Sequence, residues 1–258
     1  MSRRRVRDSG ADVSPRPRRD RARGQSNVVG VALLLGVTVM ALGALTAGIG
    51  TVVQENAAGA DAARVADGFD AALRPVETTG VRESRVAFSA GRLRVVERDL
   101  RVSSDATTRE VTVDALVYDS GDRRVAFLAG AIVRGEGEAA RVVRAPPIAG
   151  SERGDGVLVV GAPTLGADGV GVGGEGGVDV VLRTNVTHGR ERLGRGEFRV
   201  TVETATPAAW RAALREAGAE VVDVRDADGD GVPSVVARFP GERTAYLVVH
   251  EMRLEVTR

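Results

Sequence analysis

The 258-residue chain contains no cysteine and only two histidines. Without thiols it has no disulfide framework, no cysteine-ligated zinc or iron–sulfur site and no thiol nucleophile. The histidines, His188 and His250, lie 62 positions apart, a separation that argues against a multi-histidine metal site and against histidine-relayed catalysis. Lysine is absent too, so all 36 basic residues are arginine.

Aromatic residues are also scarce, at 3%, whereas glycine is abundant at 33 residues. This balance favours short strands and turns over an aromatic core. No Ser–His–acid grouping and no catalytic carboxylate pair stands out from the 35 acidic residues. We therefore predict a protein that is not an enzyme and needs no cofactor for catalysis.

The charge is spread unevenly along the chain. Residues 1–24 hold nine arginines and three aspartates, a formal charge of +6, while the other 234 residues carry 27 arginines against 32 acids, or −5. The first 24 residues have no apolar periodicity, so we expect a disordered basic leader. Such an arm can bind nucleic acid, but no interleaved aromatic residue or DNA-binding motif accompanies it, and we expect no nucleic-acid partner.

A long apolar run follows the leader, from Val28 to Val53, 26 residues without a charge. As a helix it would measure about 39 Å, enough to cross a hydrocarbon core of about 30 Å. The arginines before it predict a single-pass protein of the cell membrane, with a cytoplasmic N-terminus and an extracellular C-terminal domain. The alternative is a cleavable secretory signal, whose apolar core is usually about 7–15 residues, with cleavage near the small residues at 57–60.

Three glycines of this run, Gly36, Gly43 and Gly50, are spaced seven residues apart and fall near one stripe of a helix. Small residues allow helix backbones in lipid to approach closely. The stripe therefore predicts a helix-packing surface, or it merely reflects the abundance of glycine in membrane helices and in this chain.

The junction between leader and apolar run is the most specific feature of the sequence. Arg23-Gly24 is followed by three polar residues, Gln25-Ser26-Asn27, and then by the apolar run. Over about residues 20–55 the chain resembles the archaeal type IV pilin and archaellin group, particularly the pilin-like surface proteins of haloarchaea. Two features depart from that pattern: Asn27 stands where many of these proteins have proline, and the leader is long.

This resemblance implies a specific processing event and a class of function. A prepilin-type peptidase would cut between Gly24 and Gln25 and leave the apolar helix intact. The product would be a membrane-inserted cell-surface protein, acting as a minor pilin, assembly component or adhesion component beside other pilin-like subunits. The alternative function is an unprocessed single-pass membrane protein whose extracellular domain binds a ligand or an envelope partner.

Helical periodicity continues beyond the apolar run. Val65, Phe69 and Leu73 recur at helical spacing until Pro75, so we predict one transmembrane and spine helix over residues 25–75. The alternative is a break at Gly59 that separates two helices.

Residues 76–258 change to alternating, valine-rich segments that predict strands. The expected fold class is α+β: a long N-terminal hydrophobic helix, then an antiparallel, sandwich-like β-domain with one short helix. That helix is expected at 208–217, between Thr206-Pro207 and Gly218. The glycine-rich stretch 161–177 is expected to be a flexible loop or a lobe boundary. Strands are expected at 81–88, 93–97, 110–118, 124–128, 141–144, 157–160, 178–182, 197–204, 220–224, 235–239 and 246–256, with turns that include Ala90-Gly91 and Pro240-Gly241.

Two short motifs lie in this region. Asp226, Asp228 and Asp230 alternate in a glycine-containing loop, which predicts either a structural Ca²⁺ site or a solvated acidic turn. An EF-hand would need glutamate at the twelfth loop position, where Ala237 stands. Asn185-Val186-Thr187 forms a glycosylation sequon, so Asn185 is a candidate acceptor.

Overall fold

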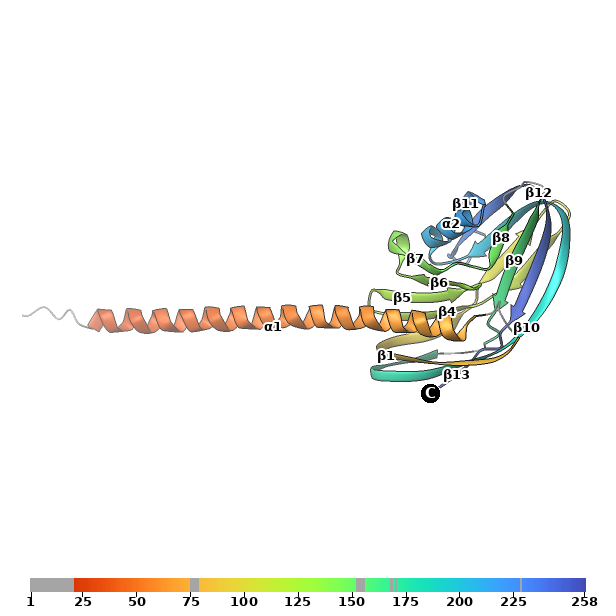
Figure 1. Cartoon of the computed structure of the whole chain (residues 1–258). Coiled ribbons are helices and arrows are strands. Elements are labelled where there is room, and N and C mark those ends of the chain that lie inside the picture. The colour runs from red at the N-terminus through yellow and green to blue at the C-terminus, as the bar shows by residue number, and fades with distance from the viewer. Residues whose placement is uncertain (1–20, 75–78, 152–155, 168, 170, 228) are drawn as a thin grey trace, which may run out of the picture. The chain divides into compact units, whose positions relative to one another are not determined.

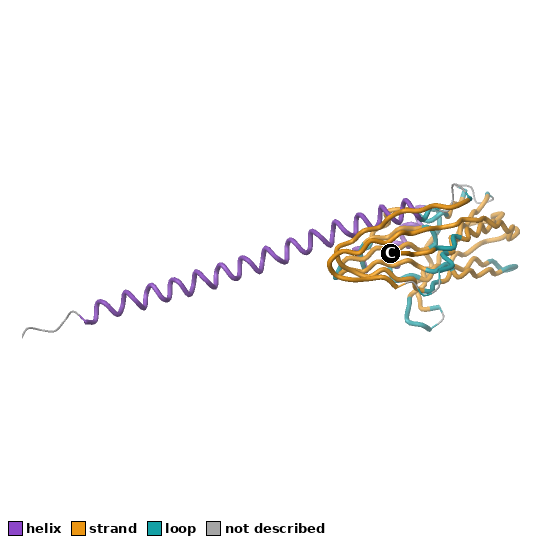
Figure 2. Tube along the Cα trace, turned by 90° about the horizontal axis from the view of Figure 1, so that it is seen from below, coloured by secondary structure: helices purple, strands orange, loops and turns teal. Residues whose placement is uncertain are grey.

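The computed structural model describes residues 21–258 except 75–78, 152–155, 168, 170 and 228 (Figure 1). The chain divides into two compact units, residues 1–53 and residues 54–258. Figure 2, with strands in orange, shows that strands make up most of the second unit.

Helix α1 runs from Arg21 to Ala72 without a break at Gly59. The predicted continuation of the helix is therefore confirmed, and the two-helix alternative is wrong. The helix begins four residues earlier than predicted, and Pro75, the expected helix stop, lies outside the described residues.

The second unit is built on one 13-stranded sheet with a short helix, so the α+β fold class is confirmed. The strands follow the path β7-β6-β5-β4-β1-β10-β12-β9-β8, with β11, β13 and the β2–β3 pair as branches. Among the described residues, all strand pairs are antiparallel except β9 with β12. The elements are β1 (Gly80–Val96), β2 (Asp99–Ser103), β3 (Thr108–Thr112), β4 (Ala115–Ser120), β5 (Arg123–Leu128), β6 (Ala131–Arg134), η1 (Gly137–Ala139), β7 (Arg141–Arg144), β8 (Ile148–Gly150), β9 (Val157–Thr164), β10 (Gly171–Glu203), α2 (Pro207–Glu216), β11 (Glu220–Asp226), β12 (Pro233–Glu251) and β13 (Glu255–Thr257).

The 33-residue strand β10 joins the two halves of the sheet. Its first half, to Val186, pairs with β1, and its second half, from Thr187, pairs with β12. Two large apolar clusters are buried, one around Trp210 and Phe198 and the other around Phe69 and Tyr118. Because β10 contributes residues to both clusters, it links the two parts of the core.

Two predicted turns are wrong. Ala90-Gly91 lies inside β1, beside a register shift after Phe88, and Pro240-Gly241 lies inside β12. At Gly91 the backbone has φ +135°, and a Cβ there would stand 2.7 Å from the ring of Tyr118. This glycine therefore permits a bulge and a close ring contact, and the chain does not reverse at it.

The loop predicted over 161–177 is also wrong for most of its length. Residues 161–164 belong to β9 and residues 171–177 to β10. A Cβ on Gly161 would stand 2.7 Å from Pro147, and one on Gly173 would stand 2.8 Å from the carbonyl oxygen of Gly91. These glycines allow close packing of backbone in a sheet. The second compact unit runs through the stretch without a division.

The predicted start and stop of helix α2 are confirmed. Pro207 occupies the first turn, Gly218 follows the helix with φ +89°, and Trp210 and Leu214 are buried. Thr206 stands at the N-cap, but its hydroxyl lies 3.2 Å from that of Thr204 and makes no capping bond.

The last turns of α1 dock on the sheet within the second unit. The carboxylate of Asp61 is buried and accepts a 2.7 Å hydrogen bond from the Ser89 amide of β1. Arg144 of β7 donates to the carbonyl oxygens of Asp70 and Leu73, each at 2.7 Å, and its Nε donates to the Asp70 carboxylate at 2.7 Å. These bonds satisfy carbonyls that a helix end leaves without partners.

Candidate functional site

Residues Val29–Ile49 of α1 are exposed and apolar, with a mean hydropathy of 2.2 over 21 residues. Their length, about 32 Å as a helix, matches the hydrocarbon core of a bilayer. The hydroxyls of Thr38 and Thr46 donate to the carbonyls of Leu34 and Leu42 at 2.7 and 2.8 Å. The helix therefore satisfies its own hydroxyl groups, as lipid requires, and suits an N-terminal signal or a membrane anchor.

The predicted processing residues Arg23, Gly24 and Gln25 are the third to fifth residues of α1. Most of the preceding leader, residues 1–20, lies outside the described residues. The cleavage site stays a prediction.

The predicted glycine stripe is open where it is described. A Cβ on Gly36 or Gly43 would have nothing within 4 Å, while the surroundings of Gly50 are outside the description. The stripe is thus available to a neighbouring helix, and its use stays a prediction.

The acidic loop joins β11 to β12, as predicted. Both carboxylate oxygens of Asp226 accept backbone amides, from Gly229 at 2.7 Å and Gly231 at 3.0 Å, and Asp230 accepts the Val232 amide at 2.7 Å. Asp228 lies outside the described residues. Calcium binding stays a prediction, since the carboxylates also hold the turn by themselves.

The sequon residue Asn185 lies in β10, opposite Val81 of β1. Asn185 and Thr187 are both exposed, whereas Val186 between them is buried. The acceptor side chain and the threonine therefore share the solvent face of the strand, and the glycosylation of Asn185 stays a prediction.

The two histidines, which their separation in sequence seemed to keep apart, meet in the fold. His188 of β10 lies directly opposite His250 of β12, with the two Nδ1 atoms 2.7 Å apart and the rings edge-on. His250 is 4% exposed, and its burial, with the neighbouring His188, lowers the pKa of His250 to about 4. The argument from separation was wrong because it ignored the register of β10 and β12, which no local signal reveals.

Comparison with known proteins identifies the family of the chain. The model of a family of unknown function, DUF7289, matches residues 23–255. The chain belongs to this family. Searches of curated proteins and of solved structures found no match.

The DUF7289 match covers α1 almost from its start and extends into β13, so the apolar helix and the sheet are parts of one family unit. The family description assigns no activity. Function must therefore be argued from the residues themselves.

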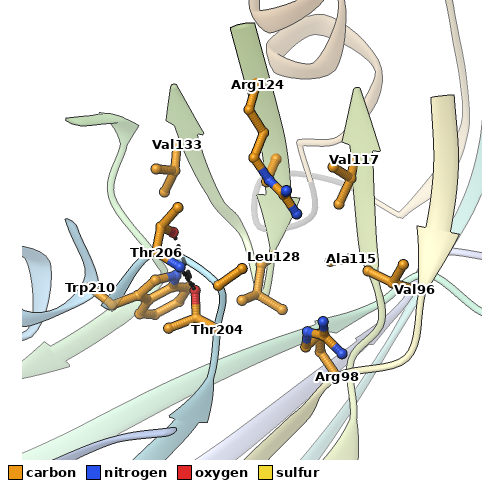
Figure 3. Close-up of a pocket in the computed structure, with 12 residues that line it drawn as sticks. Val96, Arg98, Ala115, Val117, Arg124, Leu128, Val133, Thr204, Thr206 and Trp210 are labelled. Carbon is orange, nitrogen blue, oxygen red and sulfur yellow. Dashed lines mark hydrogen bonds between the residues drawn. The ribbon is translucent and has the colours of Figure 1, made fainter. Parts of the chain in front are cut away.

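One cavity of the DUF7289 chain is lined by two arginines. Figure 3 shows Arg98, from the segment after β1, and Arg124 of β5 reaching toward the same space as Trp210 of α2. Arg98 pairs with Glu203 at 2.9 Å, and Arg124 lies 3.4 Å from Asp119. The cavity measures about 20 Å³, room for about one water molecule and far less than a small-molecule substrate needs.

Two open hollows on the second unit differ in charge. One has a volume of about 520 Å³, the other about 540 Å³. The first has four arginines, at positions 123, 124, 134 and 141, beside two acids at 122 and 136, and the second carries acids at positions 55, 61, 122 and 175. Surfaces of this kind favour charged partners.

Proposed function

We propose that this DUF7289 protein is a pilin-like, membrane-inserted cell-surface protein whose leader is removed between Gly24 and Gln25. Its role is that of a minor pilin, an assembly component or an adhesion component, without catalysis. The observation that carries the proposal is the exposed, uncharged helix Val29–Ile49 directly after a leader of charge +6.

The charge pattern supports a defined topology. Arginines on the N-terminal side hold that end in the cytoplasm under the positive-inside rule. The lipid bilayer then surrounds the apolar helix, and the sheet domain lies outside the cell.

Leader removal has a physical consequence. The leader's six net positive charges anchor the helix in the bilayer, since charges cross hydrocarbon only at high cost. Cutting after Gly24 removes this anchor, so the helix can leave the bilayer and pack against other apolar helices. The family match begins at Arg23, which leaves nearly all of the leader outside the matching region and supports its treatment as a separable segment.

Two observations support a non-catalytic role. The arginine-lined cavity has room for about one water molecule, and two hollows large enough for a ligand are open at the surface. The acidic and arginine-rich hollows favour contacts with charged macromolecular partners, including other pilin-like subunits.

The test is N-terminal mass spectrometry on protein extracted from membranes. We expect a mature start at Gln25, and replacement of Gly24 by tryptophan should abolish cleavage because the peptidase of this group needs a small residue there. Gly30→Leu, a change of glycine beyond the cut, should be processed normally. Normal cleavage of the Gly24→Trp protein would contradict the proposal, as would a start near Ala60, which indicates secretion.

The opposite charges of the two hollows favour a second candidate, an unprocessed single-pass protein that binds an envelope partner through its sheet domain. The same experiment separates the two, because the second candidate keeps its arginine leader.

A further inference from the structure

The only two histidines of the chain form one contact. They occupy directly opposed positions of β10 and β12, in a part of the sheet where His250 is also flanked by Pro163 of β9. Their backbones are therefore held by strand pairing on both sides of His250, which keeps the two rings close to each other.

We propose that His188 and His250 form a binding site for a divalent transition-metal ion of tetragonal preference, with copper(II) as the best fit. Both Nδ1 atoms would bind the ion in neighbouring positions. The proposal is independent of leader cleavage and of the pilin-like role.

The spacing of the two nitrogens is compatible with neighbouring positions of a tetragonal site. Two ligands bound at about 2.0 Å and at right angles stand about 2.8 Å apart, whereas a tetrahedral zinc site separates them by about 3.3 Å. The observed 2.7 Å separation lies closer to the tetragonal value. Copper(II) also binds nitrogen ligands more tightly than nickel(II) or zinc(II).

Binding of the ion replaces the hydrogen bond between the two rings. In the hydrogen bond between the two Nδ1 atoms one ring donates its proton and the lone pair of the other ring accepts it, so the ion must replace this bond. When the ion binds, the donating ring changes tautomer and carries its proton on Nε2. Rotation of the rings then turns both lone pairs toward the ion.

The site has an open side and no competing soft ligand. His188 is exposed, so an ion can reach the pair from solvent. The chain has no cysteine and no third histidine. Among the described residues no three His, Asp or Glu side chains gather into a metal-ligand group, so water completes the coordination shell.

The experiment is a copper(II) titration of untagged, detergent-solubilised full-length protein, followed by calorimetry and electron paramagnetic resonance. We expect one ion per chain, with an axial spectrum that shows two nitrogen ligands. His188→Gln should weaken binding at least tenfold without changing the fold, because that ring is exposed. Glu251→Gln, which removes the carboxylate next to His250 and keeps both rings, should bind like the wild type.

Three outcomes would overturn the proposal: no saturable binding, equal binding by wild type and His188→Gln, or tighter binding of zinc(II) than of copper(II). His250→Gln gives a second check, read only if its thermal melt remains cooperative. Binding by that protein at wild-type affinity would also contradict a two-histidine site. The mature N-terminal amine also binds copper(II), and equal binding by wild type and His188→Gln is the result such binding would give.

Discussion

The two parts of helix α1 contrast in how they meet their surroundings. Residues 29–49 are apolar around the whole circumference and exposed, whereas residues 61–73 bury one face against the sheet and expose the charged side chains of Arg64 and Asp67. The first pattern suits a helix surrounded by lipid, and the second suits a helix on a water-soluble domain. A single helix can therefore suit both lipid and a water-soluble domain when its apolar residues surround the helix in one part and occupy one face in the other.

The largest effect is expected at the centre of the buried face. Phe69 is fully buried among side chains of the sheet, so Phe69→Ala should lower the free energy of unfolding by about 3–5 kcal/mol. Thermal and chemical melts in detergent measure it. Leu34→Ala, on the exposed part, should change the stability of the sheet domain by less than about 0.5 kcal/mol. Equal losses of unfolding free energy in the two variants would contradict the contrast between the two parts of α1.

A charge placed in the apolar part gives the converse test. Val39→Arg should cost about 2.5–3.5 kcal/mol of membrane insertion, because arginine is unfavourable at the centre of a spanning helix. The measurement is the fraction of protein left in carbonate-washed membranes. Val222→Arg, at an exposed site of β11, is the matched control and should stay in the membrane fraction.

Two glycines of α1 sharpen the contrast further. A Cβ on Gly68 would stand 2.5 Å from Val86 Cγ2, so Gly68→Ala should destabilise the domain by about 1–3 kcal/mol. A Cβ on Gly59 would meet nothing within 4 Å, so Gly59→Ala should stabilise the helix by about 0.5–1 kcal/mol. The two melting temperatures should move in opposite directions, and a shift of both in one direction would refute the docking described for residues 61–73.

The smallest effect concerns the ion pair at the end of α1. Burial raises the pKa of Asp70, but hydrogen bonds from Arg74 and Arg144 outweigh it and lower this pKa below its ordinary value of 3.8. The ionised carboxylate therefore stabilises the fold above that value, and the contribution disappears as the pH falls through the folded pKa. Asp70→Asn should cost on the order of 1 kcal/mol at pH 7 and less at pH 3, measured by chemical denaturation. A pH-independent difference would contradict this assignment.

The local features of the fold were predictable from the sequence. The apolar run needs only composition and length, and α2 shows its start at Pro207 and its stop at Gly218. The α1 continuation follows from the spacing of Val65 and Phe69. Each of these signals lies within a few residues of the element that it defines.

The contacts between elements that are distant in sequence were not predictable. Glycine usually marks a turn. At Gly91 and Gly161, however, the missing side chain lets a neighbouring residue pack closely against the backbone inside a sheet. Only the partner segment shows whether a glycine belongs to a turn or to such a contact. The Asp70–Arg144 contact joins residues 74 positions apart, and the histidine pair joins residues 62 apart. The first depends on how α1 docks on the sheet and the second on strand register, and the pattern of one segment contains neither.

The central claim is that residues 29–49 cross the membrane and the sheet domain lies outside the cell. The chain has no cysteine, so one introduced cysteine is a clean probe for a membrane-impermeant maleimide. We predict that Glu138→Cys, at an exposed position of η1, is labelled on intact cells, whereas Ser9→Cys in the Gly24→Trp protein, which keeps its leader, is not. Labelling of Glu138→Cys only after the cells are lysed would contradict the account.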